Sequence, residues 1–128
     1  LPLYCTGVGK AILATWDTAE VRDVWQHSDV HAWTEHTIVD EGAFFREIDK
    51  VRQLGYALDN EENELGVRCI AAAIPDYRGR ASYAISLSAP VSRMTDQRAH
   101  GCAGRNRARA RRRPLLRRAE HEHTFGCA

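Results

Sequence analysis

The chain has 128 residues, of which 44% are hydrophobic and 27% are charged, a composition that suits one small folded domain. No apolar run approaches the roughly 18 residues of a membrane-spanning helix, and no charged-then-apolar leader opens the sequence. We therefore expect a soluble, cytoplasmic chain without membrane contact. The four cysteines lie far apart and form no CxxC pair, which argues against a zinc site and a disulfide framework. We expect neither a metal nor a cofactor.

The net charge of +1 conceals two segments of opposite charge. Residues 1–96 carry 9 basic and 15 acidic side chains, whereas residues 97–128 carry 9 arginines and 2 glutamates. The second segment lacks apolar periodicity, and its Arg, Ala, Gly and His content is typical of a disordered tail or of a sequence read in a shifted frame. A basic arm that contacts nucleic acid is the alternative interpretation. We expect residues 1–96 to form the domain and residues 97–128 to be an atypical tail.

Three helices are predicted in the first half of the chain. The first begins near Gly7 and continues through good helix formers. A second, short helix begins at Asp17, which fits a capping box with Glu20 three residues later. The third begins after Asp40 and ends at Gly55, a residue type that favours the position just past a helix end. Its apolar residues share one face of that helix: Phe44, Phe45, Ile48, Val51 and Leu54.

Strands are predicted in the second half. Residues 56–58 read as a short strand that leads into an acidic loop at 59–64. Two longer strands follow at 67–74 and 81–88, and the residues between them at 75–79 have the chemistry of a turn. These patterns predict a mixed α/β (α+β) fold that contains an antiparallel hairpin.

The two strands of this hairpin predict sheet faces of different chemistry, because alternate side chains point to opposite sides. The small or hydroxyl-bearing set is Val67, Cys69, Ala71, Ala73, Ser82, Ala84, Ser86 and Ser88, and the bulky set includes Tyr83, Ile85 and Leu87. Hydroxyls and a thiol with room beside them can bind a polar ligand. A helix that starts near Gly7 would add backbone N–H groups that suit a carboxylate. The alternative is that the small face simply receives a tightly packed helix.

Nucleotide binding is not indicated by the glycines at the start of the first helix. Gly7-Val8-Gly9-Lys10 lacks the GxxxxGK[ST] spacing of a phosphate loop, and Ala11 stands where a magnesium-binding hydroxyl is required. The acidic loop also lacks EF-hand spacing, so a solvated turn with Arg68 as an ion partner is the favoured interpretation. Asp59 is the exception that we single out, because it lies at a strand end, where ligands are often bound.

Two other functions remain open from the residues alone. Cys69 or Cys5 could serve as the nucleophile of a thiol enzyme, which would need a nearby base and a lowered pKa. The favoured interpretation of Cys69 is an inert, buried thiol that lines a pocket. The arginines between 105 and 118 could contact phosphates without sequence preference.

Three ordered blocks of sequence resemble the effector-binding domain of IclR-family transcription regulators. Residues 2–14 read PLYCTGVGKAILA, and residues 52–62 read RQLGYALDNEE, followed by GVRCIAA at 66–72. The third block is AISLSAP at 84–90. Together they cover about three quarters of the chain in the order and spacing of the family, which makes the resemblance specific.

The resemblance implies a GAF-like fold, in which helices flank an antiparallel sheet, with the family's first strands before Leu1. It implies a sensor rather than an enzyme, with no cofactor and no catalytic residues. Carried onto the matching positions, it implies ligand contacts at Gly7, Val8, Asp59, Val67, Cys69, Ser86 and Ser88, with Leu1 at the edge of the pocket.

The resemblance also implies partners. In this family the domain follows a winged helix-turn-helix that binds operator DNA, and the regulators form homodimers or homotetramers. The chain shows no such motif, so we expect operator contact only through a further N-terminal domain, and a small organic acid as effector. The family's amphipathic C-terminal helix does not follow Asp96, so the tail inherits no role.

Overall fold

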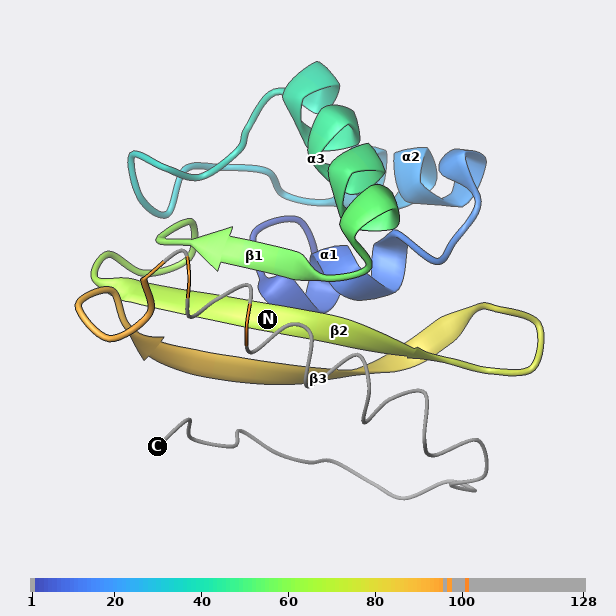
Figure 1. Ribbon diagram of the computed structural model, residues 1–128. Coiled ribbons are helices and arrows are strands. Elements are labelled where there is room, and N and C mark those ends of the chain that lie inside the picture. Colours follow the sequence, from blue (N-terminus) through green and yellow to red (C-terminus); the bar gives the residue numbers. More distant parts are fainter. Residues whose placement is uncertain (1, 96, 98–100, 102–128) are drawn as a thin grey trace.

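The computed structural model describes residues 2–95, 97 and 101 as a mixed fold of helices and antiparallel strands. The helices are α1 (Gly7–Leu13), α2 (Thr18–His27) and α3 (Glu41–Leu54), and the strands are β1 (Ala57–Asn60), β2 (Val67–Pro75) and β3 (Ala81–Pro90). The sheet has the order β1-β2-β3, and the three helices gather on one side of it (Figure 1). This arrangement confirms the predicted fold class.

Leu1 and Asp96 lie outside the described residues, as does the predicted tail at 97–128 apart from Gln97 and Gly101. The domain boundary at residue 96 and the character of the tail therefore stay predictions. No helix among the described residues is long and apolar enough to span a membrane.

The helix ends lie where the capping residues predict. The Asp17 side chain accepts a hydrogen bond from the Ala19 amide at the start of α2, and that of Asp40 accepts one from the Ala43 amide at the start of α3. Gly55 ends α3 with φ at 80°, a left-handed conformation that costs a glycine little. At the start of α1 the Thr6 hydroxyl accepts from the Gly9 amide at 3.1 Å.

Strand register confirms the predicted division of the sheet into two faces. Cys69 pairs with Ser88 and Ala71 pairs with Ser86, so the small residues of β2 and β3 lie side by side. The short first strand is longer than predicted, because β1 includes Asp59, which pairs with Cys69. Asp59 therefore belongs to the sheet rather than to the acidic loop.

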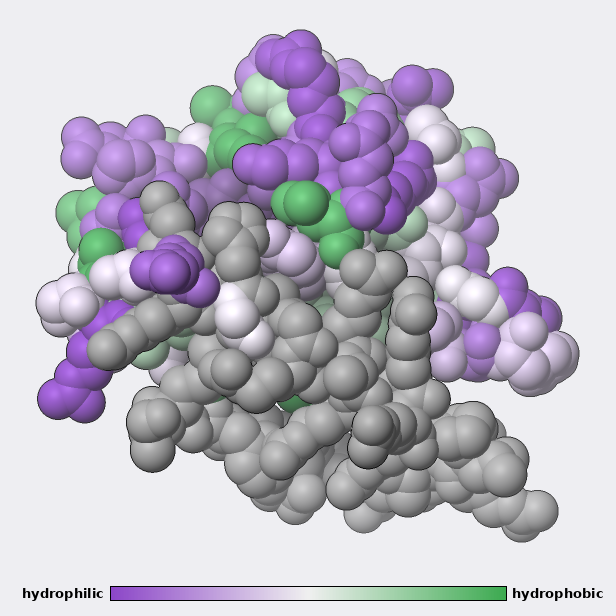
Figure 2. Space-filling model, viewed as in Figure 1, coloured by the Kyte–Doolittle hydropathy of each residue, from purple (hydrophilic) through white to green (hydrophobic). Residues whose placement is uncertain are grey.

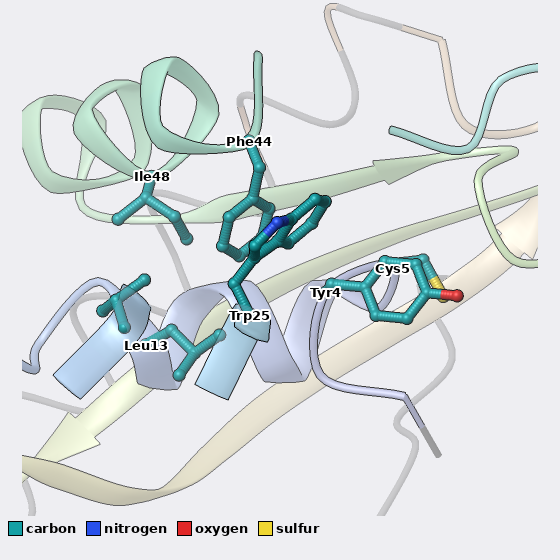
Figure 3. Close-up of a cluster of buried hydrophobic side chains, with 7 residues drawn as sticks. Tyr4, Cys5, Leu13, Trp25, Phe44 and Ile48 are labelled. Atoms are coloured by element: carbon teal, nitrogen blue, oxygen red, sulfur yellow. The ribbon is translucent and has the colours of Figure 1, made fainter. Parts of the chain in front are cut away.

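The apolar core has one part between the helices and one on each face of the sheet. Between the helices the Trp25 and Phe44 rings stack at a centroid distance of 4.6 Å, close to Leu13 and Ile48 (Figure 3). On the small face, Ala11 and Val51 pack against alanines of β1 and β2, which places α1 and α3 directly over the sheet. The bulky face holds its own cluster: Tyr56, Ile70, Leu87 and Met94.

Hydrophilic residues cover the outer side of α3, as the space-filling view shows (Figure 2). Its exposed positions include Arg46, Asp49 and Lys50, whereas Phe44, Ile48 and Val51 face the core. The helix is therefore amphipathic, as the periodicity predicted.

A close backbone approach fixes the entry to α1. A Cβ atom at Gly9 would lie 2.2 Å from the carbonyl oxygen of Leu3 and 2.5 Å from its Cα. These are backbone atoms, so no side-chain rotation can relieve the clash. Glycine is therefore required where the chain folds back over the first turn of α1.

Replacing Gly9 with alanine should lower the free energy of unfolding by about 1–3 kcal/mol, because the backbone of Leu3 must move away from the added carbon. Urea denaturation followed by circular dichroism measures this loss. Gly42→Ala in α3 is the matched control, since its added carbon meets only the side chains of Asp40 and Arg46. Equal stability of the two variants would show that α1 does not depend on the close approach.

Candidate ligand-binding site

Side chains from all three strands form one row across the small face of the sheet. Asp59 of β1 pairs with Cys69 of β2, which pairs with Ser88 of β3. The Cys69 Sγ lies 2.9 Å from the Ser88 Oγ, within hydrogen-bonding distance. Ser86 lies in the neighbouring row, opposite Ala71. The structure thus brings four of the seven predicted ligand residues onto one patch of the sheet.

The first turn of α1 lies directly against this patch. A Cβ atom at Gly7 would be 3.4 Å from the Ala71 Cβ and 3.7 Å from the Cys69 Cβ, so position 7 faces β2 beside Cys69 with room for a methyl group in ordinary contact. A side chain longer than a methyl group at position 7 would press against these residues of β2. Gly7 therefore lies beside the patch, and its contact with a ligand stays a prediction.

The two remaining predicted residues lie at the margins of the patch. Val8 is half-buried and packs against the cluster formed by Ala11, Val51 and their neighbours. Val67 is half-buried at the start of β2, where it pairs with Pro90. Val8 directly follows Gly7, and Val67 lies two residues before Cys69. The packing of Val8, however, is equally that of a core residue.

The small face receives a packed helix at one end and presents polar side chains at the other. Towards Ala73 and Ala84 it receives α1 in close contact, as the helix-packing interpretation predicted. At the other end Ser88 is exposed, so hydroxyl and thiol groups reach solvent beside Asp59 and Gly7. This second end combines a carboxyl group, a thiol and two hydroxyls, which are groups that a ligand can use.

Asp59 is a buried carboxyl group, with only 4% of its surface exposed. Burial raises the pKa of Asp59, while the backbone hydrogen bond from Glu62 and the charge of Lys10 oppose that rise. The Glu62 amide donates to its Oδ1 at 2.9 Å. The candidate site therefore contains an acid that takes up a proton more readily than an exposed aspartate does.

The predicted solvated character of the acidic loop is wrong at Glu62, because this residue is buried, with 5% of its surface exposed. This carboxylate turns inward because Lys10 of α1, which is fully buried, needs a partner of opposite charge. The Lys10 Nζ lies 2.6 Å from the Glu62 Oε2 and 3.3 Å from the Glu47 Oε1, and it also donates to the Leu58 carbonyl. The predicted partner Arg68 donates to Asn60 at 2.7 Å.

Sequence reasoning did not find Lys10 as a buried cation. The available signal was its position three residues before the fully buried Leu13, which puts both side chains on the same face of α1. A lysine on an apolar helix face requires a buried acid. Any of the four acidic residues in the predicted loop at 59–64 could have been that acid, and spacing alone does not choose among them.

Burial raises the pKa of Glu62 to about 7, against the opposing effects of the Lys10 charge and hydrogen bond. Burial raises the free energy of the ionised carboxylate by more than its attraction to the Lys10 ammonium lowers it. The nearby carboxyl groups of Asp59 and Glu47 act in the same direction as burial.

Neither described cysteine has the properties of a working nucleophile. Burial raises the pKa of Cys5 to about 11, and its Sγ lies 3.8 Å from the Asn63 side-chain oxygen. Burial also raises the pKa of Cys69, to which the negative charges of Asp59 and Glu64 contribute. Both thiols are protonated at neutral pH, which disfavours the thiol-enzyme interpretation. Among the described residues, no group of three or more His, Cys, Asp or Glu side chains is placed to hold a metal ion.

The free energy of unfolding should fall as the pH rises from 5 to 8, because Glu62 binds its proton more tightly in the folded chain than in the unfolded chain. Below pH 4.5, the pKa of glutamate in the unfolded chain, protonated Glu62 makes its full contribution to the free energy of unfolding. That contribution is lost as the pH rises through about 7, the pKa of Glu62 in the folded chain. Glu62→Gln should flatten this dependence. Urea denaturation across this pH range tests it, and an unchanged slope in the variant would assign the effect to other groups.

Comparison with known proteins gives consistent matches. The family described as "Bacterial transcriptional regulator IclR C-terminal" matches residues 1–112. The DNA-binding transcriptional repressor YiaJ of Escherichia coli (strain K12) is 40% identical over 96 residues, which cover 73% of this chain and 34% of that protein. The chain thus spans about a third of the length of this curated relative.

Solved structures agree with these sequence matches. The C-terminal domain of the E. coli transcriptional regulator KdgR has a TM-score of 0.80 and 36% identity, covering 86% of this chain and 67% of that chain. The inducer-binding domain of the PobR transcription factor from Acinetobacter, a double mutant in complex with 3-hydroxybenzoic acid, has a TM-score of 0.77 and 30% identity. That match covers 90% of this chain and 67% of the PobR chain.

Proposed function

Because the chain belongs to the family of IclR C-terminal domains of bacterial transcriptional regulators, we propose that it senses a small organic acid on behalf of a DNA-binding regulator. One observation supports this proposal above all: Gly7 lies beside the row formed by Asp59, Cys69 and Ser88 on the small face of the sheet. Ser88 is exposed, so this end of the face is open to solvent. The proposed ligand contacts are Gly7, Val8, Asp59, Val67, Cys69, Ser86 and Ser88.

Each group in this row offers the ligand a different interaction. The Ser86 and Ser88 hydroxyls can donate to an oxygen of the ligand, and the Cys69 thiol is a weak donor beside them. Gly7 lets the ligand approach the backbone where a side chain would block it. PobR, whose structure resembles this chain, is described in complex with an aromatic hydroxy acid, which supports an acid as the ligand class.

The protonation state of Asp59 decides whether the site repels or binds a carboxylate. An ionised Asp59 would repel a carboxylate, whereas a protonated Asp59 can donate a hydrogen bond to it. Burial raises the pKa of Asp59, which lowers the free energy needed to take up that proton. We therefore propose that the acid binds together with a proton.

Signal output would follow from a shift between two arrangements of the regulator. An effector that binds one arrangement more tightly increases its population, and the DNA-binding parts then change their spacing on the operator. Operator contact would come from a part of the regulator outside this chain, and the regulator would act as a homodimer or homotetramer. The relatives compared above are transcriptional regulators rather than enzymes, in accord with the protonated thiols.

A thermal-shift assay of the chain with pyruvate, gluconate and 3-hydroxybenzoate tests the ligand class. An acid at 100 times its dissociation constant should add about 2.7 kcal/mol to the free energy of unfolding and raise the melting temperature accordingly. The double variant Ser86→Ala, Ser88→Ala should bind that acid about tenfold or more weakly, since two hydrogen bonds are lost.

Ser82→Ala is the matched control for the serine variants, because Ser82 belongs to the same strand but lies at its far end. It should leave the dissociation constant unchanged. If the double variant binds as tightly as the wild type, the ligand does not contact this face of the sheet.

Acid binding should strengthen as the pH falls below neutrality, because Asp59 takes up a proton when the ligand binds. Isothermal titration calorimetry in buffers of different ionisation enthalpy counts this proton directly. Asp59→Asn should bind the acid with little pH dependence above the pKa of the ligand. Proton release, or no exchange of protons, would contradict the proposed role of Asp59.

A further inference from the structure

We propose that Lys10 is the positioning residue of the candidate site, and that its buried ammonium group sets the spacing between the start of α1 and the end of β1. These two segments supply Gly7 and Asp59. The ligand-binding part of this inference rests on the function proposed above, whereas the structural part stands on the contacts of Lys10 alone.

The contacts of Lys10 lie on both sides of Asp59. Its Nζ donates to the carbonyl of Leu58, the residue before Asp59. It also donates to the Glu62 Oε2 at 2.6 Å, and the amide of that same Glu62 donates to the Asp59 Oδ1 at 2.9 Å. A single ammonium therefore holds the residue immediately before the aspartate and the residue three positions after it. Gly7 lies one helical turn before Lys10, so it moves with the same anchor.

The turn that follows Asp59 needs such an anchor because its backbone is strained. Glu61 has φ at 60°, the left-handed region that non-glycine residues rarely adopt. The hydroxyls of Thr34 and Thr37 donate to the carbonyls of Glu61 and Glu62, which fixes the turn from the outside. Lys10 holds the same turn through the buried side chain of Glu62 and the carbonyl of Leu58.

Geometry, rather than stability, is what the ion pair supplies. A buried pair of opposite charges gives little net stability compared with apolar side chains of the same size, because both groups lose their hydration. Its hydrogen bonds are directional, however, and an apolar pair has no equivalent constraint on the backbone of Leu58 and Glu62. Removing both charges together should therefore keep the fold and loosen the site.

The test compares Lys10→Met, Glu62→Gln and the double variant with the wild type in the full 128-residue chain. Lys10→Met alone leaves Glu62 buried without its closest partner, which destabilises the fold by itself. The decisive comparison is therefore between the double variant and the wild type. Arg52→Met is the matched control, because Arg52 ties α3 to the other end of α1 through the carbonyls of Ala14 and Trp16. Hydrogen exchange by mass spectrometry and urea denaturation are measured for each protein.

We expect the amides of residues 59–63 to exchange at least tenfold faster in the double variant, while those of α3 keep their wild-type rates. The control variant should leave the exchange of residues 59–63 unchanged. With pyruvate and 3-hydroxybenzoate as probes, the double variant should bind at least tenfold more weakly than the wild type at comparable urea midpoints. A purely structural role would change the urea midpoint and affinity together.

Wild-type exchange rates at 59–63 in a folded double variant would overturn the inference, because packing alone would then hold the site. Faster exchange throughout the chain would overturn it as well, since Lys10 would then stabilise the whole domain. If neither acid shifts the melting temperature of the wild type, the proposed ligand class fails for these probes. The exchange comparison still decides the role of Lys10 in that case.

Discussion

The approach of α1 to the sheet is the constraint on which the other features of this domain depend. The helix begins with Gly7 facing the Cβ atoms of Cys69 and Ala71, and Gly9, two residues later, lies against the backbone of Leu3. A helix at this distance leaves no room for large side chains beneath it. The small residues on one face of β2 and β3 follow from that distance, because larger ones would push α1 away.

The same approach brings a charged side chain into the interior. Lys10 lies between Gly9 and Ala11 on a helix that is pressed against β1, and its ammonium has no path to solvent. Its charge is met by Glu62, Glu47 and the Leu58 carbonyl, which come from three different segments. A buried cation with oxygen partners on each side fixes the relative positions of those segments more narrowly than apolar contacts do.

The chemistry at the open end of the small face narrows the ligands that can bind there. A thiol, two hydroxyls and a buried carboxyl group lie together there, and such groups suit a polar ligand better than a large apolar one. The negative charges near Cys69 disfavour a free anion unless Asp59 is protonated. The proposed uptake of a proton on acid binding therefore rests on the burial of one aspartate.

The sequence by itself determined the order of the elements, the ends of the helices and the two faces of the hairpin. Asp17, Asp40 and Gly55 define helix ends by local hydrogen bonding and backbone conformation, which neighbouring residues settle without the rest of the fold. The small face follows from strand alternation for the same reason. The resemblance in three blocks added the family and the identity of the candidate ligand residues.

Only the tertiary structure decided how the charges inside the domain are arranged. Lys10 and Glu62 are 52 residues apart, and the acidic loop offers several carboxylates of similar spacing. Which of them turns inward depends on the distance between α1 and β1, a quantity that local sequence does not encode. Desolvation follows from the same packing, so the raised pKa values of Asp59 and Glu62 are properties of the assembled domain and not of the residues that carry them.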